Sequence, residues 1–420
     1  MRKVLEVGVI LVALAFGSAM AQSCTVTIGA DMALTGSLGV LGQQIAKGAQ
    51  LAVADLNAAG GVNGCTVKLS LADNQTQANV GVDAAKKLVD VQHVPAIVGA
   101  LSSGITTAIL TSVTAPSKVI LISPASTSPT LTELGKEGKT GGYFFRTAAS
   151  DALQGVAMAD YAYQGGLRKV AVMYLNNAYG QGLNDEFTKA FKGLGGTVTQ
   201  NVVYNPDQPS YRSEVSKALN GGPEALFLIG YPGDGTTIAR EWISSGGPQT
   251  WLLPDGLEGQ AFIDDVGGQY FKKVYGTAPG TSDTPSLATF RKEFKAKFGS
   301  LPTQAFITNA YDATVIVGLA MEYAKTTTDT AAIRDAMRKV TDPNGQKVYA
   351  GVDELQAAKG LMKLGTTVQY IGATGPLQFN QYGDVAGPYV KWTVDSSGKV
   401  TQNGMITVAE IQKVQAELAK

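Results

Sequence analysis

The strongest constraint on this fold is a repeated alternation of apolar strands and amphipathic helices. Four apolar strands are expected in a first series, at residues 24–30, 66–72, 94–100 and 119–122. Apolar residues at helical spacing lie between them, over residues 45–56, 80–91 and 105–113. Several strand–helix–strand units in succession predict a mostly parallel α/β sheet.

A second series begins after residues 143–147 and repeats the first pattern. Its strands are expected at residues 169–175, 197–203, 225–229 and 251–253, with helices near 183–194 and 238–242. Two α/β series predict two similar lobes with a cleft between them. Residues 276–280 are interpreted as another crossing, 309–325 as a long helix and 377–384 as a strand with a polar turn. Residues 408–420 are expected to form a short amphipathic helix or a frayed tail.

The amino terminus has the three parts of a secretory signal. Arg2 and Lys3 precede an apolar run at residues 7–16, and Ala19 and Ala21 supply the small residues of a cleavage site. The run is too short to span a bilayer, which needs about 20 residues. We therefore predict a signal peptide over residues 1–21 and an exported, soluble product. Lipid attachment at Cys24 is the alternative, although residues 21–23 match a lipobox poorly.

The two cysteines, Cys24 and Cys65, are expected to pair in an oxidising compartment. They open the first two predicted strands, and such openings can be neighbours at one edge of a sheet. Two cysteines and one histidine cannot supply the ligands of an ordinary zinc site, so no metal is expected. Basic and acidic residues balance at 34 each, which favours neither nucleic acid nor an anionic membrane as a partner.

Small hydroxyl residues follow two predicted strands directly. Ser103 comes after the strand that ends near residue 100, and Thr127 comes after the strand at 119–122. If these strand ends lie side by side, both hydroxyls and nearby backbone N–H groups face one crevice, which suits a small anion. The alternative is that these residues only cap helices.

Six stretches together resemble one known family. They are GAQLAVADLNAAGG (48–61), GALSSGIT (99–106), ISPAST (122–127), FRT (145–147), YGQG (179–182) and GPLQFN (375–380). In this order they resemble the periplasmic substrate-binding proteins of branched-chain amino acid ABC transporters, the leucine/isoleucine/valine-binding family. The resemblance implies the type I periplasmic binding fold, in which two Rossmann-like lobes are joined by three hinge crossings. It also implies that residues 24–145 and 278–372 form lobe 1, that 146–277 and 373–408 form lobe 2, and that 409–420 form a C-terminal tail.

The resemblance also implies which residues bind the ligand. A zwitterionic amino acid needs donors for its carboxylate, and the matching positions are Ser103, Thr127 and the backbone at Ala125. Its ammonium needs an acid, and the matching position is Asp255 in lobe 2. The alternative for Asp255 is an exposed position in a Pro-Asp-Gly turn.

Three further positions bear on the ligand. Tyr179 and Tyr231 match aromatic positions at the family's cleft, where each could cover the ligand and form a hydrogen bond. Alternatively, either tyrosine fills the interface between the lobes. Leu41 stands where leucine-binding relatives tend to carry a tyrosine, which alters the wall that meets the ligand side chain.

The resemblance therefore implies a periplasmic solute-binding component of an ABC importer that captures a branched-chain type of amino acid or a related small polar ligand. Its expected partners are a membrane permease and its ATPases, with the protein itself a monomer that needs no cofactor. A sensory module for a membrane signalling protein is the alternative. An enzyme is not favoured: the segment at 138–140 lacks the first glycine of a phosphate-binding loop, with Glu133 in its place, and no G-x-S-x-G motif is present.

Overall fold

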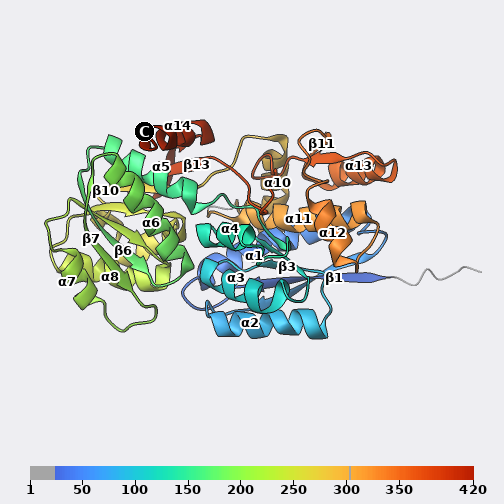
Figure 1. Cartoon of the computed structure of the whole chain (residues 1–420), viewed down its shortest axis with the longest axis horizontal. Coiled ribbons are helices and arrows are strands. Elements are labelled where there is room, and N and C mark those ends of the chain that lie inside the picture. Colours follow the sequence, from blue (N-terminus) through green and yellow to red (C-terminus); the bar gives the residue numbers. More distant parts are fainter. Residues whose placement is uncertain (1–23, 302–303) are drawn as a thin grey trace, which may run out of the picture.

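The computed structural model describes residues 24–301 and 304–420 as two lobes, each built on its own β-sheet (Figure 1). The predicted signal peptide at residues 1–21 lies outside the described residues. No helix in the described part of the chain is both long and apolar enough to cross a membrane.

The first lobe contains a parallel sheet in the order β2-β1-β3-β4-β5. Its strands are β1 (Thr25–Met32), β2 (Thr66–Asp73), β3 (Ala96–Gly99), β4 (Ile120–Ser123) and β5 (Phe144–Arg146). The helices of this first segment are α1 (Gly39–Ala58), α2 (Ala78–Lys86), α3 (Ser103–Ile109) and α4 (Pro129–Lys136), with π-helical turns at Lys87–Val91 and Leu110–Thr114. β3 and β4 pair directly, so the two strand ends that precede the hydroxyl residues lie side by side, as predicted.

A later part of the chain completes this lobe. It contributes α10 (Pro285–Phe298), α11 (Ile307–Ala324), α12 (Thr330–Met337) and α13 (Val352–Lys363), with the short parallel strands β11 (Gln346–Val348) and β12 (Val368–Tyr370). α11 is buried along almost its entire length and packs against α1 (Figure 1). Its middle, residues 315–321, is a continuous apolar run, and a helix that is apolar all round at this point is stable only inside a core.

The second lobe contains a seven-stranded sheet in the order β14-β13-β10-β9-β8-β6-β7. Its parallel strands are β6 (Lys169–Leu175), β7 (Thr197–Tyr204), β8 (Ala225–Ile229), β9 (Thr250–Leu253) and β10 (Lys273–Pro279), and β13 (Tyr389–Val394) and β14 (Val400–Ile406) add antiparallel pairs. Its helices are α5 (Asp151–Gln164), α6 (Ala178–Gly193), α7 (Arg212–Ala218), α8 (Pro232–Ser244) and α9 (Gln260–Val266), with 3-10 turns at Asp255–Leu257 and Gly268–Tyr270.

The chain ends in α14 (Val408–Leu418), so the helix is the correct one of the two alternatives for this segment. Thr407 and Glu410 form a capping box at its start, which satisfies backbone N–H groups that the first turn leaves without partners. Ile411 is buried, and α14 contacts α5 and α6 of the second lobe.

Three neighbouring segments carry the chain between the two sheets. Arg146 donates its backbone N–H to the carbonyl of Gly383 at 2.9 Å, and Gly280 donates to that of Pro388 at 2.8 Å. Of the strand with a polar turn predicted at residues 377–384, the turn forms at residues 381–382 and the strand does not, because the N–H groups of Tyr382 and Asp384 donate to Oδ1 of Asn380. Gly383 has a φ of +85°, and a Cβ there would lie 2.0 Å from the carbonyl oxygen of Phe144. The residue boundaries predicted for the lobes remain a prediction.

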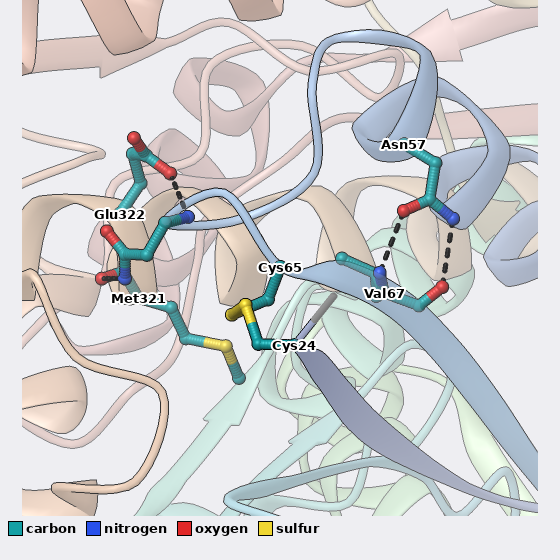
Figure 2. Close-up of a disulfide and its surroundings, with 7 residues drawn as sticks. Cys24, Asn57, Cys65, Val67, Met321 and Glu322 are labelled. Carbon is teal, nitrogen blue, oxygen red and sulfur yellow. Dashed lines mark hydrogen bonds between the residues drawn. A yellow bond between two sulfur atoms is a disulfide. The ribbon is translucent and has the colours of Figure 1, made fainter. Parts of the chain in front are cut away.

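The predicted disulfide between Cys24 and Cys65 is present, where β1 and β2 begin (Figure 2). Two further contacts hold the same region. The side chain of Asn57 donates to the carbonyl of Val67 at 2.9 Å and accepts its N–H at 2.8 Å. Asn63 donates its backbone N–H to Glu322 at the end of α11. The chain around Cys65 is therefore held by side-chain hydrogen bonds as well as by the disulfide.

Replacing both cysteines by serine is expected to lower the free energy of unfolding by about 3–4 kcal/mol, since the bridge closes a loop with a sequence separation of 41. Urea unfolding of the double variant Cys24→Ser/Cys65→Ser measures this effect. Wild-type protein unfolded in a thiol reductant is the control and should show the same loss. Equal midpoints for the variant and the oxidised protein would contradict the prediction.

Candidate functional site

A narrow pocket lies between the two lobes, with about 290 Å³ of space not filled by protein atoms, open solvent included, of which about 20 Å³ can hold the centres of water-sized groups. Six of the predicted ligand-binding residues line it: Leu41, Ser103, Ala125, Tyr179, Tyr231 and Asp255. Its other lining residues are Leu38, Ile45, Leu101, Gly256 and Phe306. The structure thus brings residues from distant parts of both lobes to one small enclosed space.

The wall from the first lobe is built from the segments that follow β3 and β4. Ser103 is buried, and its Oγ accepts the backbone N–H of Ser128 at 3.2 Å, which leaves its own proton to donate elsewhere. Ser128 caps α4 through its hydroxyl, whereas Ser102 forms no side-chain cap on α3. Ser128 is therefore a helix cap, whereas Ser103 lines the pocket and is available to a ligand.

Thr127 does not line the cavity. Its side chain is buried and donates from Oγ1 to Oδ2 of Asp151 at 2.9 Å. Asp151 is the first residue of α5 and is fully buried, and its Oδ1 has no hydrogen-bond partner in the described part of the chain. Because an ionised carboxylate can only accept, the Thr127 hydroxyl is committed to Asp151 when that acid is charged.

The wall from the second lobe carries Asp255 in the 3-10 turn after β9. Asp255 is only 3% exposed, so its interpretation as an exposed turn residue is wrong. The Tyr179 hydroxyl donates to Oδ1 of Asp255 at 3.2 Å and accepts the N–H of Gly256 at 3.2 Å. A Cβ on Gly256 would lie 2.5 Å from the carbonyl oxygen of Gly230, so only glycine permits this close approach.

Tyr231 connects the two walls. Its ring stacks on that of Tyr179 with centroids 5.5 Å apart and an angle of 7° between the planes. Its hydroxyl donates to Oγ of Ser102 in the first lobe at 3.0 Å. Ser128 makes a second polar contact between the lobes, donating to the carbonyl of Ala178 at 2.7 Å. The structure therefore shows the lobes in contact across the cavity.

Buried acids give the second-lobe side of the cavity its electrostatic character. Burial raises the pKa of Asp255 to about 7, and hydrogen bonds from Gln154 and Tyr179 oppose this only in part. Burial also raises the pKa of Glu258 to about 7 and, with the charge of Asp255, the pKa of Asp151. Arg146 lowers the pKa of Asp151, but its guanidinium already pairs with Asp384 at 2.7 Å. A cationic group in the cavity would compensate these acids.

The remaining wall is apolar. Leu38 and Leu41 belong to the start of the first helical region, and Phe306 immediately precedes α11. Sequence reasoning missed Leu38, Ile45, Leu101, Gly256 and Phe306. Leu38 and Ile45 share the helical spacing that marks α1 as amphipathic. Phe306 has no motif around it, and its backbone has an unusual φ of +69°. Asp151 was also missed, although a serine directly before an acid is typical of a helix start.

Three comparisons place this arrangement among known proteins. A family model described as periplasmic binding protein matches residues 25–371. The Leu/Ile/Val-binding protein homolog 3 of Brucella melitensis is 30% identical over 322 residues, covering 76% of this chain and 85% of that protein. The Leu/Ile/Val-binding protein BraC3 of Rhizobium johnstonii is 29% identical over 318 residues, covering 74% and 83%.

A solved structure extends the likeness to the fold. The crystal structure of a leucine-binding protein from Thermotoga maritima superposes with a TM-score of 0.77 at 25% identity, covering 92% of this chain and 99% of that one. The two lobes and their mostly parallel sheets accord with these matches. The chain therefore belongs to the periplasmic binding protein family and is related to its Leu/Ile/Val-binding members.

Proposed function

We propose that this protein is the solute-binding component of an ABC importer and captures an amino acid of the branched-chain type between its lobes. One observation carries the proposal: the pocket combines a serine hydroxyl, a buried acid and an aliphatic wall in one small space. These are the three surfaces that an aliphatic zwitterion requires. The similarity to Leu/Ile/Val-binding proteins supports the same ligand class.

The ligand carboxylate is assigned to the first lobe. Ser103 faces the cavity with a hydroxyl whose lone pair is already used by Ser128, so its proton is available to an anion. Ala125 lines the same wall. A hydrogen bond to an ionised group contributes about 1.5–3 kcal/mol. We assign Thr127 an indirect role, because its hydroxyl donates to Asp151 and its side chain lies outside the cavity wall.

The ligand ammonium is assigned to Asp255, with Asp151 behind it. Both acids are buried, and neither forms a salt bridge with another described residue. Tyr179 holds one oxygen of Asp255 in place, and Tyr231 covers the cavity beside it. Because these groups belong to the second lobe and Ser103 to the first, one ligand contacts both only when the lobes are together, and it therefore favours the closed state.

The cellular setting follows from the family and from the amino-terminal signal pattern. We propose export to the periplasm, a monomeric protein, and recognition of the closed form by a membrane permease whose ATPases drive import. The ligand is released unchanged, so no catalysis and no cofactor is proposed. Leu41 and Phe306 form the wall that selects the side chain, which favours leucine, isoleucine or valine over charged amino acids.

Isothermal titration of the purified protein with leucine, isoleucine and valine tests this function, with aspartate and lysine as ligands that should not bind. Ser103→Ala is expected to weaken binding about tenfold, since it removes one hydrogen bond to a charged group. Ser117→Ala, at an exposed position in the turn before β4, is the matched control and should bind normally. Absence of binding by all three aliphatic amino acids, or recovery of a chemically altered ligand, would contradict the proposal.

A further inference from the structure

Three glycines lie where a helix of one lobe meets the other lobe. They are Gly104 in α3 of the first lobe, and Gly182 in α6 and Gly233 in α8 of the second lobe. None of the three has a positive φ, so any residue could adopt their backbone conformations. Glycine also makes a helix less stable than alanine does, because it loses more conformational freedom on folding. The helices themselves therefore do not require glycine at these positions.

Gly182 packs against the start of α4 in the first lobe (Figure 1). A Cβ at this position would lie 2.7 Å from Cδ of Pro129 and 2.9 Å from Oγ of Ser128. Neither neighbour can turn away. The Pro129 Cδ belongs to a ring that is closed on the backbone, and the Ser128 hydroxyl donates to the carbonyl of Ala178 at 2.7 Å. A side chain at position 182 would therefore push the two lobes apart.

The other two glycines have similar neighbours. A Cβ on Gly233 would lie 3.0 Å from Oγ of Ser37 and 3.1 Å from its Cα, and rotation of the Ser37 side chain does not move the Cα. A Cβ on Gly104 would lie 3.3 Å from Cβ of Asn177, whose side chain is held in place because it caps α6. The approach between the lobes is thus closest at Gly182 and least close at Gly104.

All three positions face the opposite lobe rather than their own. For each glycine, the three atoms nearest to an added Cβ belong to a residue or residues of the other lobe. These close approaches exist only when the lobes are together, so a small side chain there would meet no comparable obstacle in an open molecule. The effect of such a side chain would fall on closure and not on the folding of either lobe.

We propose that Gly182, Gly233 and Gly104 are positioning residues for ligand capture, because the absence of a side chain at these three positions allows the lobes to close fully. A side chain there would act as a spacer between the lobes. It would weaken any ligand that is held by contacts to both lobes, since such a ligand binds tightly only to the closed conformer. This inference rests on the proposed function, which places the ligand between the lobes.

Gly182→Ala and Gly182→Gln test this role in the full chain through two measurements. Isothermal titration with leucine should show an affinity about tenfold weaker for Gly182→Ala, the loss expected from overpacking a close contact, and a weaker one still for Gly182→Gln. The melting temperature of ligand-free Gly182→Ala should equal or exceed that of the wild type, because alanine has the higher helix propensity. A residue needed only for folding would lower the affinity and the melting temperature together.

Gly360→Ala is the matched control. Gly360 is an exposed glycine of α13, and a Cβ there would meet nothing within 4 Å, so this substitution should leave leucine binding unchanged. Adding Pro129→Ala to Gly182→Ala removes the atom nearest to the new Cβ and should restore part of the affinity. Equal affinity of the wild type and both Gly182 variants, or no gain from Pro129→Ala, would overturn the proposal.

Single-molecule energy transfer measures closure without relying on leucine. Dyes attached at Lys86→Cys in α2 and Lys217→Cys in α7, two exposed positions in different lobes, report the distance between the lobes. The ligand-free wild type is expected to be closed part of the time, and Gly182→Gln should reduce this closed fraction several-fold. Failure of leucine to bind the wild type would count against the proposed function alone. An unchanged closed fraction in Gly182→Gln, or a wild type that never closes, would overturn the role of the glycines.

Discussion

Replacing Arg146 by methionine is expected to lower the free energy of unfolding by about 3–5 kcal/mol, the cost of leaving one partner of a buried ion pair without its counter-charge. Arg146 is fully buried, and its Nε donates to Oδ1 of Asp384 at 2.7 Å. Its Nη1 also donates to the carbonyl of Ser128 at 3.0 Å, and its Nη2 to Oγ1 of Thr132 at 2.8 Å. Methionine fills much of the same space but supplies none of these bonds.

Urea unfolding of Arg146→Met measures this loss. The double variant Arg146→Met/Asp384→Leu removes the uncompensated carboxylate as well, so it should regain part of the stability. Lys136→Met is the matched control, because Lys136 forms its ion pair with Glu133 at the surface and its removal should leave the unfolding midpoint unchanged. An unfolding midpoint for Arg146→Met equal to that of the wild type would show that the buried pair does not stabilise the fold.

Arg146→Met should also weaken ligand binding. The guanidinium donates to the carbonyls of Ser126 and Ser128, on either side of Thr127, and so fixes the segment that carries Ala125 to the hinge. Titration with leucine at a temperature where the variant is still folded separates this effect from the loss of stability. Unchanged affinity would mean that other contacts, such as the hydrogen bond from the Ser126 N–H to the Ser123 hydroxyl, hold the segment without Arg146.

Asp255→Asn is expected to weaken binding of an amino acid about 30-fold or more, which corresponds to the lower limit of about 2 kcal/mol for removing one partner of a buried charge pair. The amide keeps the size of the side chain, and it can still accept from Tyr179. Asp265→Asn, at an exposed position of α9, is the matched control and should bind normally. Unchanged affinity in Asp255→Asn would place the ligand ammonium elsewhere.

The pH dependence of binding provides a second measurement on the same acid. The pKa of Asp255 is about 7 in the ligand-free protein, so below pH 7 the acid holds a proton that an ammonium ligand must displace. Affinity should therefore fall by about tenfold per pH unit as the pH decreases below 7 and level off above it. Burial raises the pKa values of Asp151 and Glu258 as well. A flat profile between pH 5.5 and 8 would contradict the assignment.

The free energy of unfolding of the ligand-free protein should fall as the pH rises, whereas the affinity for the ligand rises. The folded protein binds a proton at Asp255 at pH values where the unfolded chain, with an ordinary pKa of 3.8, has already released it. The ligand-free protein therefore loses stability as the pH rises from about 4 to 7, and the loss is complete above the folded pKa. Asp255→Asn removes the charge and should melt at a higher temperature than the ligand-free wild type at pH 8.

Periodicity and the two strand–helix series predicted the parts of the fold that local sequence controls. β6 and β8 begin and end where the apolar runs do, and β3 pairs with β4 as the placement of the hydroxyl residues requires. The segment at 377–384 is predicted to be a strand with a polar turn. The turn forms, but the Gly383 carbonyl accepts the N–H of Arg146 at the hinge, a contact between residues far apart that no local pattern contains.

The candidate site was predictable only through the family resemblance. Tyr179 belongs to one of the quoted stretches and Tyr231 to a matching aromatic position, and their rings stack beside the pocket that both line. Thr127 belongs to a motif too, but the direction of its side chain depends on Asp151, which lies on another helix. Phe306 reaches the cavity through the placement of α11, which is set by packing against α1 rather than by neighbouring residues.

The hydrogen bond between Tyr231 and Ser102 has a consequence for the protein without ligand. This bond joins the lobes and uses no ligand atom, so it lowers the free energy of the closed conformer even when the cavity is empty. A fraction of the unliganded molecules is then always closed, and this basal fraction competes with loaded molecules for any partner that recognises the closed shape. Stronger direct contacts between the lobes, this one and that of Ser128 with Ala178, would thus tighten ligand capture and also raise the number of empty molecules that occupy the partner.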